Sequence, residues 1–494
     1  KMMNDADIMC KNNEFTYTMS SIFKTNKGGL MAFDKKKRYL KDTFRVAIPS
    51  IVEHIANVIV GFADTIMVAV LGTAATASVG INATITWFLL ACSTLFAVGT
   101  TVQVAQSIGA NNEKRAKRAT INGLSSGFIA FTVIFVITFL LAKFIPGWLG
   151  ADSEIMDDAV TYLRIWSLSI IPMFSGIVAS SVLRAIGNTK VPMLVAFFIN
   201  ILNIIGNFLL IYDTRVVTLP LTKYSFRLWG ANLGVTGAAI STAMANSLGG
   251  IIMVTLLFNG SQKIHLHFSD LFKFEKVLLK HINKTGTPAA GQDMVTNFGQ
   301  VLYQKMVSTL GTIQIAAHHL ATTAESLSYM PAAGFSVAAT TLVGQALGAG
   351  NKEDAENYGK ICFELSIVAG IISGILLYIF PWQLMSLFSN DPAVIEEGVG
   401  ALRIIAFVQP MFNSSIVLTG VLTGAGDTKV PLYASLGGMW FVRLIAAYLF
   451  INVFELGLKG AWMGMFLDLA FRFVIVFIRY IKKEWLNAEI IVDD

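Results

Sequence analysis

Charge is scarce in this chain of 494 residues: Asp, Glu, Lys and Arg make up 14% of it. An ordinary soluble domain has about 25% of such residues. Cysteine is scarcer still, with 3 residues that show neither metal-site spacing nor a disulfide framework. Hydrophobic residues reach 54% and the mean hydropathy is +0.64. This composition argues against a soluble domain and predicts a membrane protein.

Long apolar runs recur along the chain between polar or glycine-containing segments. A run of about 20 apolar residues is long enough to cross a bilayer as a helix. We therefore expect an all-α polytopic membrane protein with twelve transmembrane helices. The expected spans are 46–70, 79–105, 120–145, 160–183, 191–212, 236–258, 285–309, 317–345, 361–384, 400–424, 430–455 and 459–481.

The second half of the chain repeats the first at a constant offset. LRAIGNTKVPM, which begins at Leu183, aligns with LTGAGDTKVPL, which begins at Leu422, 239 positions later. The Leu-Gly-Thr segments that begin at Leu71 and Leu310 have the same offset. Because six spans is an even number, both units start on the same membrane face and are related by an axis along the membrane normal. Such repeats are typical of secondary transporters, whose substrate site lies between them.

The charged loops predict the orientation. Basic segments such as DKKKRYLKDTFR, NNEKRAKR and RYIKKEW all fall on one face, whereas GADSEIMDD and SNDPAVIEEG fall on the other. By the positive-inside rule, the basic face and both termini are cytoplasmic in a cell membrane. The exception is the loop 213–233, an insertion that the second half lacks. The net charge of +6 thus reflects topology, and no nucleic-acid partner is expected.

These patterns predict five regions. Residues 1–34 are polar, lack the apolar core of a signal peptide and predict a loose tail. The expected regions are a cytoplasmic tail (1–40), an amino-terminal lobe or N-lobe (41–260), a basic cytoplasmic linker (261–284), a carboxyl-terminal lobe or C-lobe (285–482) and a second cytoplasmic tail (483–494).

Ionisable residues within the spans are the best candidates for function, because each costs at least about 2.5–3.5 kcal/mol at the bilayer centre. Four residues of the first span have spacings that place them on one helical face: Glu53, Asn57, Gly61 and Asp64. The fifth span carries an amide stripe: Asn200, Asn203 and Asn207. Carboxylate and amide oxygens suit Na⁺ or a proton relay. The alternative is a hydrogen-bonded packing seam between helices.

The second lobe keeps this stripe in neutral form. Asp64 aligns with Tyr303 and Glu53 with Gln292. The uncharged stripe of the seventh span is Gln292, Thr296, Gln300 and Tyr303. Because the lobes have diverged, we expect ion coupling in the first lobe and substrate contacts in the second or between the two.

Three further groups carry charge in the second half. Asp293 either faces a cavity or pairs with Lys305, and Glu325 either faces a cavity or forms a helix contact. Asp468 and Arg472 have the i, i+4 spacing of an ion pair that Arg443 could join, and we interpret this group as structural.

Several long segments, in the same order, resemble one transporter family. GFADTIMVAVLGTAA, TTLVGQALGAGNKEDA and LTGAGDTKVPLYASLGGMWFVR are similar to the multidrug and toxic compound extrusion (MATE) family, in its bacterial NorM-like branch. The similarity runs from about residue 40 to about residue 480. It implies two six-helix lobes related by a pseudo-two-fold axis. It also implies export of amphipathic, mostly cationic compounds in exchange for Na⁺ or H⁺, by alternating access and without a cofactor.

The resemblance also implies residue roles. Asp64 matches the aspartate of the family's first span, and Pro49 matches the proline associated with bending of that helix. Asn203 and Asn207 match a pair whose second member is an acid in the family, and Thr242 matches a threonine of the sixth span. These residues make up the expected coupling-ion site.

The remaining polar positions are expected to serve the cavity, the substrate or a proton relay: Glu53, Asn57, Gln292, Asp293, Thr296, Gln300, Tyr303 and Glu325. Where classical NorM proteins carry two C-lobe acids, this chain has Thr296 and Phe412. The main alternative is a flippase for lipid-linked oligosaccharides from the same superfamily. A channel would need a continuous polar pore, and an enzyme a nucleophile–base pair or metal cluster. We expect a monomer that is not an enzyme.

Overall fold

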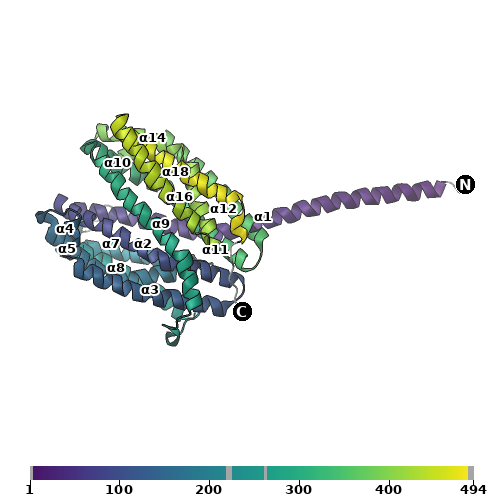
Figure 1. Cartoon of the computed structure of the whole chain (residues 1–494), viewed down its shortest axis with the longest axis horizontal. Coiled ribbons are helices and arrows are strands. Elements are labelled where there is room, and N and C mark those ends of the chain that lie inside the picture. Colours follow the sequence, from purple (N-terminus) through teal and green to yellow (C-terminus); the bar gives the residue numbers. More distant parts are fainter. Residues whose placement is uncertain (1–3, 219–224, 261–263, 488–494) are drawn as a thin grey trace.

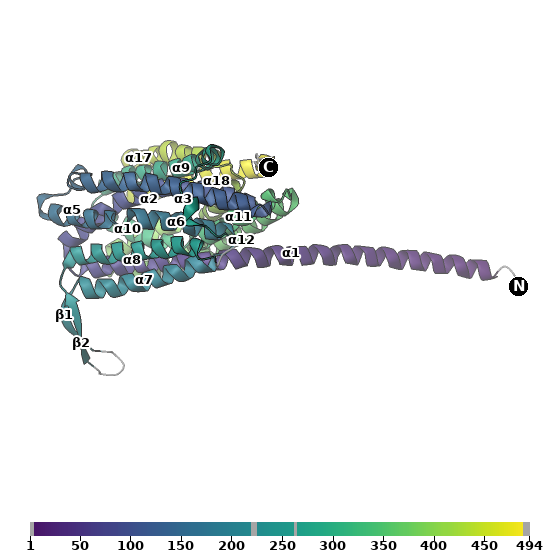
Figure 2. The same ribbon diagram turned by 90° about the horizontal axis from the view of Figure 1, so that it is seen from below.

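The structure is a computed structural model that describes residues 4–218, 225–260 and 264–487 (Figures 1 and 2). Side chains are described from Lys35 onward, apart from those at 215–228 and in the two internal gaps. Helices make up almost all of the regular structure in these ranges, and one hairpin of two strands completes it.

The first half of the chain forms six membrane-crossing segments. The helices are α1 (Asn4–Ala69), α2 (Thr73–Gly109), α3 (Glu113–Leu141), α5 (Ser153–Ser167), α6 (Ile170–Ala185), α7 (Lys190–Leu210) and α8 (Gly234–Phe258). Helices α5 and α6 form one broken segment that bends by 50°. The four-residue helix α4 (Ile145–Trp148) lies in the preceding turn.

The second half repeats this order. Its helices are α9 (Lys276–Ser308), α10 (Thr312–Ser326), α11 (Met330–Gly348), α12 (Lys352–Ile379), α13 (Pro381–Ser386), α14 (Pro392–Ala406), α15 (Gln409–Gly424) and α18 (Gly457–Ile481). Helices α14 and α15 bend by 59°. The eleventh segment consists of α16 (Lys429–Leu436), α17 (Leu444–Tyr448) and the π-helical stretches η2 (Gly437–Arg443) and η3 (Leu449–Val453). Two short 3-10 helices, η1 (Phe268–Asp270) and η4 (Glu484–Asn487), complete the helical elements of the described ranges.

The expected set of twelve spans is confirmed. In the described ranges, 9 helical segments are long and apolar enough to cross a membrane, and the 2 bent pairs bring the number to 11. The twelfth is α9, which is less apolar because its middle turns carry Gln292, Asp293, Asn297 and Gln300. Each expected range overlaps one of these segments, and α10 and α11 together fill the expected span 317–345.

The turns of the two halves share their backbone conformation as well as their sequence. Gly72 has φ 112° and Gly311, at the equivalent position, has φ 114°. Residues other than glycine rarely adopt such φ angles, so the repeated Leu-Gly-Thr segment needs its glycine. The duplication therefore extends to the local geometry of the chain.

The two halves form two lobes whose ribbons meet near α11 and diverge toward α10 and α14 on one side and α4 and α5 on the other (Figure 1). At the end where they meet, Gln345 Nε2 donates to the Ala185 carbonyl oxygen at 2.7 Å. Gln106 Nε2 donates to the Gly424 carbonyl oxygen at 3.4 Å. Each donor and acceptor of one contact is 239 positions from its counterpart in the other. We call this end, which carries the basic loops, the inner end.

Two features differ from the sequence-based expectation. Residues 4–34, expected as a loose tail, continue α1 as helix and extend away from the bundle (Figure 2). This stretch has no proline to interrupt a helix. The inserted loop 213–233 forms an antiparallel hairpin of β1 (Asp213–Thr218) and β2 (Ser225–Ala231) at the opposite end. Its β-branched and aromatic residues favour strands.

Candidate functional site

Asp64 lies on α1, where its carboxylate meets the amide stripe of α7. Asn207 Nδ2 donates to Asp64 Oδ1 at 2.6 Å. The Asn203 amide, with its NH₂ group toward Asp64, donates to Oδ1 at 2.6 Å and Oδ2 at 3.1 Å. In this orientation the side-chain oxygen of Asn203 accepts a hydrogen bond from Thr242 Oγ1 at 3.3 Å. The four residues expected in the coupling-ion site therefore form one connected cluster.

This cluster leaves the carboxylate of Asp64 without a positive partner. In the described part of the chain, no lysine, arginine or histidine forms an ion pair with Asp64. Asn203 is 5% exposed and Asn207 is 1% exposed, so the amides are held away from the surrounding medium. The side-chain oxygen of Asn207, Oδ1, is buried without a hydrogen-bond partner. The site thus has one unpaired carboxylate and a spare oxygen ligand.

Close packing of α7 on α8 sets this geometry. A Cβ atom on Gly206 would lie 2.4 Å from Ser241 Oγ, so any larger residue would force the Ser241 side chain to shift. Ser241 Oγ donates to the backbone carbonyl oxygen of Asn203 at 2.9 Å and fixes the backbone beside the side-chain amide. Tyr162 on α5 lies near Thr242. The sequence did not single out Tyr162, because a lone tyrosine in an apolar span has no distinguishing pattern.

The polar stripe of α1 continues from Asp64 toward the inner end. Asn200 Nδ2 donates to Asn57 Oδ1 at 3.0 Å. Glu53 Oε1 accepts from Arg184 Nη2, on α6, at 2.5 Å. A cavity of about 370 Å³, here called the N-lobe cavity, lies beside these residues. Its lining includes Glu53, Asn57, Met173, Ser180, Asn200 and Met253.

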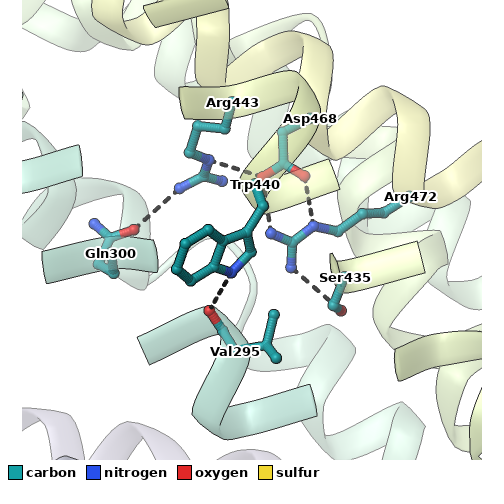
Figure 3. A network of polar contacts seen from close by, with 7 residues as sticks. All are labelled: Val295, Gln300, Ser435, Trp440, Arg443, Asp468 and Arg472. Carbon is teal, nitrogen blue, oxygen red and sulfur yellow. Dashed lines mark hydrogen bonds and ion pairs between the residues drawn. The ribbon is translucent and has the colours of Figure 1, made fainter. Parts of the chain in front are cut away.

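Figure 3 shows a polar network of the second lobe, in which an aspartate is paired with two arginines. Asp468 accepts from Arg443 Nε at 2.7 Å and from Arg472 Nε at 2.6 Å. Arg443 Nη1 donates to Gln300 Oε1 at 3.1 Å. Trp440 Nε1 donates to the Val295 carbonyl oxygen at 3.2 Å. Asp468 is fully buried, and the predicted contact of Arg443 with the Asp468–Arg472 pair is confirmed.

Two residues of the neutral stripe of α9 lie next to Arg443, and the other two lie nearer the inner end of the helix. Tyr303 is fully buried, with Arg443 Cζ 5.5 Å from its ring centre. Gln300 contacts Arg443, whereas Gln292 and Thr296 are half-buried nearer the inner end of the helix. Glu325 is 2% exposed and accepts from Gln409 Nε2 at 3.4 Å.

Asp293 links the two lobes instead of pairing along its own helix. Its Oδ2 accepts from Thr94 Oγ1, on α2, at 2.8 Å. The expected alternative of a pair with Lys305 is wrong. Lys305 is exposed, and twelve residues of helix separate the two by about 18 Å. Pro49 lies within α1, one turn before Glu53, as the first-span pattern required.

Comparisons with known proteins agree with this arrangement. The MatE family model matches residues 49–209 and 288–449, more than half of the chain and one segment in each lobe. The probable multidrug resistance protein NorM of Thermotoga maritima is 28% identical over 457 residues, covering 90% of this chain and 93% of the relative. The uncharacterized transporter YisQ of Bacillus subtilis is 26% identical and covers 90% and 94%.

Solved structures share the fold. A MOP superfamily transporter from Pyrococcus furiosus aligns with a TM-score of 0.82 at 21% identity, covering 91% of this chain and 97% of that one. A mutant of the Vibrio cholerae MATE transporter VcmN aligns with a TM-score of 0.81 at 19% identity, covering 92% and 98%. Together, the duplicated lobes, the first-span acid and the matched segments show that the chain belongs to the MatE family of multidrug efflux transporters, in its bacterial NorM-like branch.

Proposed function

We propose that this transporter exports amphipathic, mostly cationic compounds in exchange for Na⁺ or H⁺, and that Asp64 binds the coupling ion. The observation that carries the proposal is the contact of one unpaired carboxylate with two buried amides and a hydroxyl. An unpaired acid in a medium of low dielectric attracts a cation strongly. The other N-lobe acid, Glu53, already has Arg184 as its partner.

The amides give the site two states. With no ion, the NH₂ groups of Asn203 and Asn207 donate to the carboxylate of Asp64. When Na⁺ binds, a rotation of either amide by about 180° turns its oxygen toward the ion, because amide nitrogen and oxygen occupy nearly the same positions. When a proton binds instead, a rotated amide oxygen accepts the new O–H group. The same side chains therefore serve either coupling ion.

The two hydrogen bonds between the lobes at the inner end, Gln345 to Ala185 and Gln106 to Gly424, suit a conformation that is closed on that side. With the basic loops in the cytoplasm, Asp64 would take its ion from the external side and release it after the lobes reverse. A change in the bend of α1 near Pro49 would connect the occupancy of Asp64 to this movement. The transporter acts as a monomer in this scheme, because each lobe already has its partner within one chain.

The buried arginines favour drug export over flipping of lipid-linked oligosaccharides. A flippase for an anionic lipid needs free basic groups along its path, whereas Arg184 and Arg443 both form ion pairs. Drug–ion exchange in proteoliposomes, with Na⁺ and pH gradients imposed separately, tests the proposal. We expect ethidium uptake into inside-out vesicles driven by one of the two gradients. Ethidium flux that ignores both gradients would refute ion-coupled export.

A further inference from the structure

Glu53 and Arg184 form an ion pair in which one polar atom of each side chain has no hydrogen-bond partner. Arg184 Nη2 contacts Glu53 Oε1 at 2.5 Å. Glu53 is 7% exposed, and its second oxygen, Oε2, is buried without a partner. The Nε atom of Arg184 is likewise buried without a partner. An arginine and a carboxylate prefer two parallel hydrogen bonds, so this one-bond arrangement leaves a free acceptor on Glu53.

The pair lies between two cavities. Glu53 and Arg184 both line the N-lobe cavity of about 370 Å³. Arg184 also lines a second cavity of about 270 Å³, here called the axial cavity. Its lining includes the equivalent positions Thr101 and Thr340, and Arg184 and Thr423, each 239 apart, so it lies on the pseudo-two-fold axis. The guanidinium thus has space on both sides.

The walls of the axial cavity can receive a guanidinium group. Thr101, Thr340 and Ser181 line it and donate their hydroxyl hydrogens to backbone carbonyl groups. A hydroxyl oxygen whose hydrogen is committed in this way still accepts hydrogen bonds. A volume of about 270 Å³ also holds several water molecules, since each takes about 30 Å³ in the liquid. The axial cavity therefore offers acceptors and water to a cation.

The second lobe lacks both members of the pair. Glu53 aligns with Gln292, and Arg184 aligns with Thr423. The two charges are therefore present together in one half of the duplication and absent together from the other. A charge pair that served only to stabilise the shared helix packing would be as useful in either lobe. Its presence in one lobe points to a task that is specific to the N-lobe cavity.

We propose that Arg184 is a tethered competitor for cationic substrates: an organic cation with N–H donors displaces it from Glu53 in the N-lobe cavity. Arg184 then occupies the axial cavity. This inference rests on the proposed export of cations and names the group that recognises them. When Arg184 returns to Glu53, it competes with the substrate for the carboxylate and promotes release. The structure, with the pair formed, corresponds to the releasing state.

The position of Arg184 connects this exchange to the contact between the lobes. Its carbonyl oxygen accepts from Thr341 Oγ1 at 3.2 Å, and the next residue, Ala185, accepts from Gln345 at 2.7 Å. Both donors belong to α11 of the other lobe. Movement of the Arg184 side chain therefore occurs at the residue where the inner ends are joined.

The test is equilibrium binding of ethidium, a cation with amino donors, to the purified full-length protein by isothermal titration calorimetry. Arg184→Gln removes the competitor, and we expect ethidium to bind about tenfold more tightly, a change of roughly 1.4 kcal/mol. Arg184→Lys keeps a competing cation and should bind ethidium within about twofold of the wild type. The matched control is Arg164→Gln, the same substitution at an exposed arginine of α5 that lines neither cavity, and it should leave the affinity unchanged.

The double variant Glu53→Gln/Arg184→Gln distinguishes competition for Glu53 from a general loosening of the helices. The increase in ethidium affinity caused by Arg184→Gln should disappear when Glu53 is already neutral. If Arg184→Gln binds ethidium no more tightly than the wild type, or if the gain persists in the double variant, the proposal is wrong. A wild type that binds ethidium but never exchanges it for an ion would refute coupled export and leave the role of Arg184 standing.

Discussion

Gly348 of α11 packs directly against the backbone of Gln106 in α2: a Cβ atom on Gly348 would lie 2.0 Å from the Gln106 carbonyl oxygen. The reciprocal contact exists as well, since a Cβ atom on Gly109 would lie 1.9 Å from the Gln345 carbonyl oxygen. Two helices from different lobes thus cross at the inner end with backbone against backbone. This contact holds the two lobes together at the inner end. We therefore expect its loss to favour a conformation in which the inner end is open.

We predict that Gly348→Ala destabilises the closed inner end by about 1–3 kcal/mol, the usual cost of forcing an extra methyl group into a packed contact. The measurement is thermal unfolding in detergent, together with alkylation of a cysteine introduced at Thr341. Labelling there should become faster. Gly80→Ala is the control, because nothing lies within 4 Å of the added Cβ. Equal behaviour of the two variants would argue against a closure contact.

Asp64→Asn should abolish gradient-driven export while leaving the protein folded, because an amide occupies the same space and costs less in lipid than a carboxylate. The measurement is ion-driven ethidium flux in proteoliposomes, and size-exclusion chromatography checks the fold. Transport at the wild-type rate under the same gradient would place the coupling site elsewhere, with Asp293 as the next candidate.

Asn207→Asp should strengthen the dependence of transport on Na⁺. The new carboxylate would lie about 2.6 Å from the present contact atom of Asp64, and two acids there need a cation between them. The Na⁺ concentration for half-maximal flux should fall severalfold. Asn200→Asp, which adds an acid about two turns earlier on the same helix beside Asn57, is the matched control. An unchanged Na⁺ response in Asn207→Asp would remove α7 from the ion site.

Asp468→Asn should destabilise the C-lobe by about 3–5 kcal/mol, because it leaves two buried arginines without their counter-charge. Chemical unfolding followed by tryptophan fluorescence measures this change. Asp427→Asn removes the partner of the more exposed Arg479 and should cost far less. A mild effect at Asp468 would show that the network in Figure 3 is not a structural element of the lobe.

The segment between α8 and α9 should keep its fold to low pH. Hydrogen bonds from Lys117 and then Lys273 lower the pKa of Asp270 to about 2, below the unfolded value of about 3.9. The stabilising contribution is therefore fully present above about pH 4 and is lost as the pH falls through about 2. Hydrogen exchange of residues 264–275 should show this loss of protection. Asp270→Asn should remove the pH dependence of that region, and protection that is already lost near pH 5 would contradict the assignment.

Much of the fold follows from periodicity alone. Bilayer thickness and apolar run length set the spans, and the offset between Leu183 and Leu422 set the two lobes. Helical spacing likewise placed Asn203 and Asn207 on one face of α7. The pairing of that face with Asp64 depended on the resemblance as well, because spacing orients a side chain without naming its neighbour.

Contacts between distant segments were harder to predict. Arg184 lies just beyond the expected fourth span, 160–183, yet it reaches Glu53, 131 positions earlier. A signal was present, since Gln292 and Thr423 show that both charges are missing together from the repeat. The link between Asp293 and Thr94 had no such signal, because threonine is common in membrane helices.

The hairpin of β1 and β2 has a practical consequence for imaging. Two lobes of similar size and helix number look alike in projection, so a particle image can be assigned an orientation that exchanges them. In the described residues the hairpin occurs on the first lobe alone, at the end opposite the extension of α1 (Figure 2). An antibody fragment raised against the hairpin would mark the first lobe. It would distinguish the two orientations without contacting the transmembrane helices.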